Sequence, residues 1–188
     1  MYDIGAGAGR LYEAAVRAGY AYSACDVSAA LVARFRTMHP GADIHWTDGR
    51  SLPWRTGSGD VGLLTYHVLE AIIGRRNRLR TLLEVRRVLR QGAVLYVSHH
   101  VAMRYRPRQQ LRSFFGGLGL EEYGDISITG SSGAGDHALS SYRTHIISAL
   151  ECGWLARVSG FAVQDRWPFD ASSERSARCA IMERWSAV

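Results

Sequence analysis

The sequence predicts an α/β fold in which helices cover both faces of a doubly wound, mostly parallel sheet. The chain has 188 residues, 47% of them hydrophobic, which is enough for one domain with its own core. Short apolar runs alternate with segments of helical periodicity through the first hundred residues. Such alternation indicates right-handed crossovers, and therefore a parallel sheet covered on both faces.

The first half of the chain is expected to supply five strands and three helices. Met1–Ile4 is a short strand that runs into a glycine-rich loop, and Gly19 closes the helix after that loop. Ser28 is the expected N-cap of the second helix, and Gly92 is expected to stop the third. The other expected elements are helices at Leu11–Ala18, Ser28–Met38 and Leu79–Arg90, and strands at Tyr20–Cys25, Ala42–Trp46, Val61–Tyr66 and Ala93–Ser98.

After His100 the alternation weakens. Met103–Phe115 is expected to be helical, and Gly116–Gly135, which holds seven glycines, is expected to be a flexible loop. A helix at Ile146–Val158 and strands at Phe161–Gln164 and Ala177–Glu183 would complete a sheet of about seven strands. We therefore expect one domain over residues 1–188, with an insertion at about 101–141.

The composition limits the class of partner and the cellular location that we expect. All 23 basic residues are arginine, and the net charge is +6. An anionic partner such as RNA would suit this charge, but a GC-rich gene explains the same composition and is the explanation we favour. The three cysteines (Cys25, Cys152 and Cys179) form no CxxC pair, so we expect no disulfide framework, no metal site and a cytoplasmic location. We assign Cys25 to the core. No apolar run reaches the ~20 residues of a membrane helix, so no membrane partner is expected.

The predicted strand ends carry the residues of interest, because ligands of open parallel sheets bind beyond the carboxyl ends of the strands. Gly5 and Gly7 lack Cβ atoms where the backbone must turn and approach a ligand. Arg10 stands where a dinucleotide fingerprint needs glycine or alanine, and there is no P-loop lysine. The strand ends read Asp3 to Gly9, then Asp26-Val27, Asp48-Gly49, Tyr66-His67 and Ser98-His99-His100.

The pattern Asp3-x-Gly5-x-Gly7-x-Gly9 resembles motif I of the class I S-adenosylmethionine-dependent methyltransferases. The resemblance implies a Rossmann-like sheet with S-adenosyl-L-methionine as cofactor. Because only two residues precede Asp3, the family's N-terminal cap is missing, and we expect the chain to be truncated at its start. Further similar stretches follow in family order: Asp26, Asp48-Gly49, Leu52-Pro53-Trp54, Gly59-Asp60-Val61, residues 83–92 and Ser159-Gly160-Phe161.

The resemblance also implies roles for individual residues. Asp26 would accept hydrogen bonds from the ribose hydroxyls, and Asp48 would accept the exocyclic amine of adenine. The backbone N–H of Gly49 would meet a ring nitrogen. The full cofactor-binding set implied is Asp3, Gly5, Ala6, Gly7, Asp26, Val27, Asp48, Gly49 and Tyr66.

Histidines at predicted strand ends are candidate general bases. A base is needed only if the acceptor must lose a proton. We take His67 and His99 as the catalytic candidates, although no carboxylate completes a motif with them in the sequence. His99 and His100 are adjacent and should face opposite sides of a strand, so they should not share a metal. Tyr142 and His145 are candidates for the wall of the substrate site.

The leading interpretation is a methyltransferase that acts on an O, N or C nucleophile of a small molecule. Thr65-Tyr66-His67-Val68 replaces the Asn-Pro-Pro-Tyr of the amino methyltransferases, which disfavours that branch. A non-catalytic binding or scaffold domain, dimerising through the open edge of the first strand, is a second possibility. A nicotinamide dehydrogenase is disfavoured by Arg10. A tRNA methyltransferase would use the arginines at 75, 76, 78, 80, 104, 106, 108 and 112.

Overall fold

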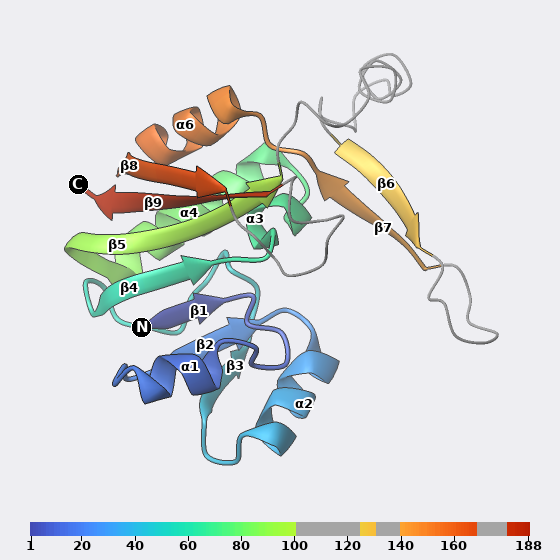
Figure 1. Ribbon diagram of the computed structural model, residues 1–188, viewed down its shortest axis with the longest axis vertical. Coiled ribbons are helices and arrows are strands. Elements are labelled where there is room, and N and C mark those ends of the chain that lie inside the picture. Colours follow the sequence, from blue (N-terminus) through green and yellow to red (C-terminus); the bar gives the residue numbers. More distant parts are fainter. Residues whose placement is uncertain (101–124, 131–139, 169–179) are drawn as a thin grey trace.

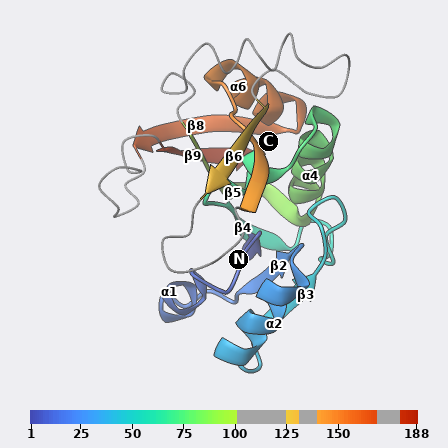
Figure 2. The same ribbon diagram turned by 90° about the vertical axis from the view of Figure 1, so that its right-hand side faces the viewer.

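The computed structural model describes residues 1–100, 125–130, 140–168 and 180–188 (Figures 1 and 2). Its main sheet has seven strands in the order β3-β2-β1-β4-β5-β9-β8. The strands are β1 (Tyr2–Ile4), β2 (Ser23–Asp26), β3 (Asp43–Trp46), β4 (Gly59–Leu64), β5 (Leu89–His100), β8 (Phe161–Pro168) and β9 (Ala180–Ala187). A second sheet pairs β6 (Asp125–Gly130) with β7 (Ser140–His145), and the helices are α1 (Tyr12–Arg17), α2 (Ala29–Met38), α3 (Val68–Ala71), α4 (Arg75–Val88) and α6 (Ala149–Val158).

The order of the strands creates one crevice. From β1 the chain winds outward through β2 to β3, and it then returns to place β4 on the other side of β1. All of these pairings, and that of β4 with β5, are parallel, whereas β9 runs antiparallel to both β5 and β8. The switch between β1 and β4 is the place where an open α/β sheet binds ligands.

Helices pack on both faces of the sheet, as the alternating pattern predicts. Neighbouring residues of β2 point into different cores: Ala24 packs with Phe35 of α2, whereas Cys25 packs in the core that holds Leu82 of α4 and Leu155 of α6. Cys25 is therefore a core residue, as expected. The doubly wound, mostly parallel sheet of seven strands is confirmed. None of the helices in the described residues is long and apolar enough to cross a membrane.

Two local expectations can be compared directly with the structure. The hydroxyl of Ser28 accepts the backbone N–H of Leu31 at 3.3 Å, so it caps α2 as predicted. The expectation that Gly92 stops the preceding helix is wrong. Helix α4 ends at Val88, since Leu89 already has extended backbone angles and begins β5. Gly92, with φ +75°, instead lies in β5 where the register against β4 shifts.

The region after β5 also departs from expectation. Part of the expected loop at 116–135 is strand β6, which pairs with β7 over Asp125–Gly130. The expected helix at Met103–Phe115 lies outside the described residues. In Figure 1 the β6–β7 hairpin extends beyond the sheet, on the side toward which β4 and β5 point. The hairpin therefore lies on the side of the sheet that carries the crevice.

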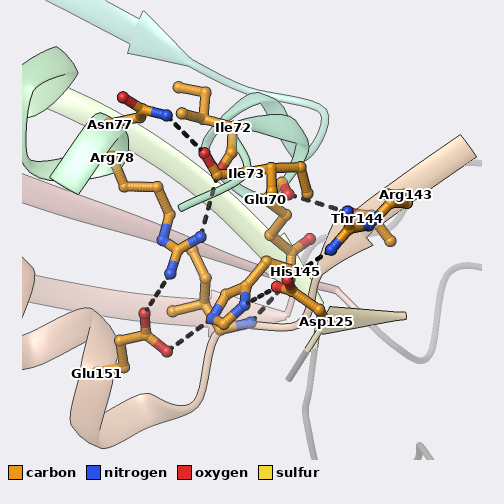
Figure 3. A network of polar contacts seen from close by, with 11 residues as sticks. Glu70, Ile72, Ile73, Asn77, Arg78, Asp125, Arg143, Thr144, His145 and Glu151 are labelled. Atoms are coloured by element: carbon orange, nitrogen blue, oxygen red, sulfur yellow. Dashed lines mark hydrogen bonds and ion pairs between the residues drawn. The ribbon is translucent and has the colours of Figure 1, made fainter. Parts of the chain in front are cut away.

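A buried polar network joins this hairpin to the main body (Figure 3). The ring of His145 lies between two carboxylates: Nδ1 is 2.7 Å from Asp125 and Nε2 is 2.9 Å from Glu151. Glu151 in turn accepts a hydrogen bond of 3.0 Å from Arg78, a fully buried side chain that also donates to the carbonyl of Ile72. The hairpin is thus tied to α6 and α4 through ionic hydrogen bonds.

Replacing Arg78 should expose the energetic importance of this network. Arg78→Met keeps the aliphatic volume but leaves the partly buried Glu151 without its guanidinium partner. We expect a loss of about 3–5 kcal/mol in the free energy of unfolding, measured by urea denaturation. The matched control is Arg76→Met on the exposed face of the same helix, which should change stability by less than about 0.5 kcal/mol. Equal losses in the two variants would contradict this account.

Candidate active site

One buried carboxylate fixes the glycine-rich loop after β1. The backbone N–H of Gly7 donates to Oδ2 of Asp26 at 2.8 Å, and that of Ser28 donates to Oδ1 at 2.8 Å. Asp26 is only 7% exposed. Each of its oxygens still has a free lone pair, because a carboxylate offers about four acceptor sites. The end of β2 therefore holds the loop and the start of α2 and keeps capacity for a ligand.

The backbone conformation and the close packing at position 5 both require glycine. Its φ is +78°, and a Cβ there would lie 2.5 Å from a methyl carbon of Val68, the first residue of α3. Its N–H donates to the carbonyl of Cys25 at 2.8 Å. The backbone of β1 and helix α3 therefore approach each other closely at the switch point.

A cavity of about 300 Å³ opens at this place, which is within the usual range for small-molecule sites. Five of the residues expected to bind the cofactor line it: Gly5, Asp26, Val27, Asp48 and Gly49. Its other wall comes from α3, α4 and their connection. The residues there, which sequence reasoning missed, are Val68, Ala71, Ile72, Ile73, Asn77 and Thr81.

Asp48 is partly engaged by its own neighbour. The guanidinium of Arg50 donates to both carboxylate oxygens, at 3.2 and 2.7 Å, and the backbone N–H of Arg50 adds a third bond of 2.9 Å. These hydrogen bonds hold the pKa of Asp48 below its usual value. Arg50 also reaches Asn77 at 3.3 Å, so its side chain lies at the rim of the cavity. A ligand amine at Asp48 would share the carboxylate with this arginine.

Four expected cofactor residues lie elsewhere. Ala6 and Gly7 line a neighbouring depression on the other side of the loop. Asp3 is 3% exposed and accepts a hydrogen bond from the hydroxyl of Tyr22. Burial raises its pKa to about 6, although the bond from Tyr22 opposes this shift. Tyr66 stacks against the guanidinium of Arg10, whose central carbon is 3.3 Å from the ring centre.

The short segment Leu52–Trp54 is held by the same helix that lines the cavity. Glu84 of α4 accepts the backbone N–H of Leu52 at 3.0 Å. Arg87 pairs with Glu84 and donates to the carbonyls of Leu52 and Trp54. These contacts connect two of the stretches singled out in the sequence, and they anchor the loop that follows Asp48 and Gly49.

His67 and His100 share one carboxylate. Glu70, on α3, is fully buried, and its Oε2 lies 3.1 Å from Nδ1 of His67 and 2.6 Å from Nδ1 of His100. Burial alone would raise the pKa of Glu70, but the hydrogen bond from His100 and the close contact with His67 outweigh it and lower the pKa to about 2. No sequence motif pointed to this carboxylate, which the fold brings to the histidines.

His99 lies in the core. It is 2% exposed, with Nε2 at 3.2 Å from Glu183 and Nδ1 at 2.9 Å from the carbonyl of His100. Burial lowers the pKa of His99, but the bond to Glu183 outweighs it and the net shift is upward. Both partners are acceptors, so both ring nitrogens act as donors and neither is placed to accept a proton.

Tyr142 and His145 are the two residues expected at the wall of the substrate site. His145 is buried in the network of Figure 3, away from the cavity lining, and the side chain of Tyr142 is outside the described part of the chain.

The carboxylates paired with histidine should make stability depend on pH. The pKa values of Glu70 and Glu183 fall from 4.5 to about 2 in the folded state. Stabilisation from both is therefore present above about pH 4.5 and is lost as pH falls toward 2. Asp3 opposes them, because its raised pKa disfavours the folded state above about pH 4.

Urea denaturation from neutral pH down to about 3 should show falling stability, with a shallower fall in Glu183→Gln. The exposed-site control Glu13→Gln should keep the wild-type slope, and a steep slope kept by Glu183→Gln would refute the assignment.

Comparison with known proteins shows the family. The model of a family described as "Methyltransferase domain" matches residues 2–97, half of the chain. No curated protein matches the sequence. A solved S-adenosylmethionine-dependent methyltransferase from Methanosarcina mazei is 18% identical, with a TM-score of 0.81 over 100% of this chain and 91% of that one. The CcbJ methyltransferase from Streptomyces caelestis is 17% identical, with a TM-score of 0.74 over 100% and 88%.

A third similar structure is the 1,6-didemethyltoxoflavin-N1-methyltransferase from Burkholderia thailandensis. It is 14% identical, with a TM-score of 0.67 over 100% of this chain and 70% of that one. At such identities the likeness shows the fold alone, and the family match over residues 2–97 adds membership. The chain therefore belongs to the methyltransferase-domain family, and it has the fold of the class I S-adenosylmethionine-dependent methyltransferases.

Proposed function

We propose that this chain transfers a methyl group from S-adenosylmethionine to a small-molecule acceptor, with the cavity at the β1–β4 switch as its cofactor site. The single observation that carries the proposal is the buried Asp26 at the end of β2. It organises the glycine loop through Gly7 and still offers lone pairs to the cavity. When bound, the cofactor supplies a methyl group activated for in-line displacement.

The residues of the cavity fit this cofactor. Asp26 supplies the acceptor that two ribose hydroxyls need, and Gly5 leaves the backbone free of a Cβ beside it. Asp48 and the N–H of Gly49 supply one acceptor and one donor for the adenine edge. The apolar side chains of Ile72 and Ile73 offer a wall for a flat base. The contribution of these residues would be to bind and align the two reactants, which is the main requirement of methyl transfer.

A small-molecule acceptor is favoured over RNA by one arginine of the expected cluster, although Arg75, Arg76 and Arg80 are exposed. Arg78, one of the expected RNA-binding cluster, is fully buried and paired with Glu151. The expected arginines at 104, 106, 108 and 112 lie outside the described residues. One similar solved structure is a 1,6-didemethyltoxoflavin-N1-methyltransferase with bound 1,6-didemethyltoxoflavin, and the CcbJ structure is a further methyltransferase of similar fold. We also propose that the chain forms one domain and acts in the cytoplasm, where the buried thiols of Cys25 and Cys152 stay reduced.

Binding of the cofactor tests the proposal directly. Titration of the protein with S-adenosylmethionine by calorimetry should show one site, and Asp26→Ala should weaken it by about tenfold to a hundredfold. The reason is that hydrogen bonds to a charged group contribute about 1.5–3 kcal/mol each. The measurement requires that each variant unfolds cooperatively, because Asp26 also holds the glycine loop.

The matched control is Asp43→Ala. Asp43 lies on the neighbouring strand β3 and accepts a hydrogen bond from Ser23, but it does not line the cavity. Affinity in this variant should stay at the wild-type value. If the folded wild-type protein fails to bind the cofactor, the catalytic proposal is wrong and a non-catalytic binding domain is the better description.

A further inference from the structure

The pair of His67 and His100 lies next to the proposed cofactor cavity along the chain and the sheet, although neither residue lines the cavity itself. His67 lies between the end of β4 and the start of α3, and His100 ends the adjacent strand β5. The next residue, Val68, packs against Gly5 and lines the cavity. The two rings therefore lie at the carboxyl edge of the sheet, beside the β1–β4 switch.

The carboxylate behind the two rings can only accept hydrogen bonds. The lowered pKa of Glu70 keeps it ionised, and besides the imidazoles it accepts the backbone N–H groups of His100 and Ile147, at 3.2 and 3.3 Å. Nδ1 of His67 is buried, and its contact with Oε2 is too bent to count as a full hydrogen bond. A lone pair on that nitrogen would still face a buried anion at 3.1 Å, which is repulsive. The neutral ring therefore keeps its proton on Nδ1 and its lone pair on Nε2.

The backbone holds His67 in an unusual position. Tyr66 and His67 are consecutive non-glycine residues with φ of +57° and +65°. Such residues cost on the order of 1 kcal/mol each and persist where the surroundings hold them, often at functional sites. The N–H of His67 donates to the hydroxyl of Ser98 at 3.3 Å, and its ring stacks on His100 with centroids 3.6 Å apart. The side chain is 25% exposed although Nδ1 is buried, so the exposed part of the ring lies away from Glu70.

The geometry favours proton transfer over metal binding. Two imidazoles and a carboxylate also serve as the ligands of some zinc sites. A metal needs lone pairs that converge on one point, however, and these two rings are nearly parallel, at 16°. Their Nδ1 atoms approach one carboxylate oxygen side by side. This arrangement orients the rings as donors to Glu70.

We propose that His67 is the general base of the reaction, that Glu70 is its positioning residue, and that the acceptor carries a weakly acidic hydroxyl such as a phenol. In the step, the acceptor's O–H bond breaks and its proton moves to Nε2 of His67. The acceptor oxygen forms the new bond to the methyl carbon, and the carbon–sulfur bond breaks with its electron pair remaining on sulfur. An acceptor with a free lone pair and no proton to lose would not need this base. The inference rests on the proposed function.

The position of the imidazole proton can be measured without an acceptor. In ¹⁵N-labelled protein with a neutral His67 ring, the nitrogen shifts of His67 should show Nδ1 protonated and Nε2 bare. Glu70→Gln should move the proton toward Nε2, because the amide can donate to Nδ1. The His145 signals, from a separate buried pair, report whether that variant keeps the fold. A proton on Nε2 of His67 in the wild-type protein would overturn the proposal whether or not the variant folds.

Activity supplies the second test, with a phenol, a thiophenol and an aniline built on the same ring as acceptors. His67→Asn should lower kcat for the phenol by about 10²–10⁴-fold. The thiophenol, which ionises without help near neutral pH, should lose less than about tenfold. His45→Asn is the control, because His45 also pairs with a carboxylate, Asp43, but on the edge strand β3.

Cofactor affinity is measured in every variant, so loss of the cofactor site is distinguished from loss of the base. Equal losses for the phenol and the thiophenol would overturn the role of His67. So would activity abolished by a chelator. Failure of the wild-type protein to methylate any phenol while it binds the cofactor would overturn the acceptor class.

Discussion

The site depends on a single carboxylate that accepts hydrogen bonds from two parts of the chain. Asp26 joins the loop after β1 to the beginning of α2, and the N–H groups it accepts would otherwise be unpaired at a sheet edge. Because the loop is fixed there, Gly5 can press against Val68 and α3 can lie across the end of β4. The position of α3 then places Glu70 between His67, which precedes this helix, and His100 at the end of β5. One hydrogen-bonded aspartate thus links the two halves of the candidate active site.

Three glutamates that are buried or partly buried are compensated by nearby donors, whereas burial raises the pKa of Asp3. Glu70, Glu183 and Glu151 each face a histidine, and the last two also face an arginine. Removing water from a carboxylate is costly unless donors replace that water, so each acid sits where several donors converge. Two of these acids, Glu183 and Glu151, make hydrogen bonds within the protein interior. Glu70 differs because one of its partners, His67, is a partly exposed histidine that directly precedes Val68, a residue of the cavity lining.

The sequence predicted the sheet and the line of residues at its carboxyl edge, because periodicity and glycine spacing are local signals. It could not predict Glu70 beside His100, or Glu183 beside His99. Those pairs are created by α3 folding back over β5 and by β9 pairing with β5, across 30 and 84 residues of chain. The prediction that the helix ends at Gly92 was wrong for a similar reason. A glycine with positive φ ends many helices. Here, however, the chain already pairs with β4 at Leu89, three residues before Gly92.

The antiparallel strand β9 has a consequence for the order in which the molecule can assemble. It lies between β5 and β8, so β8 has no neighbour in the main sheet until β9 arrives. On a ribosome, β8 emerges first and must wait for a strand made later. Helix α6, which packs against β8 and buries Leu155, is the contact available to it in the meantime. Completion of the sheet is therefore a late, long-range event, and chains stalled before β9 would expose an unpaired edge to other proteins.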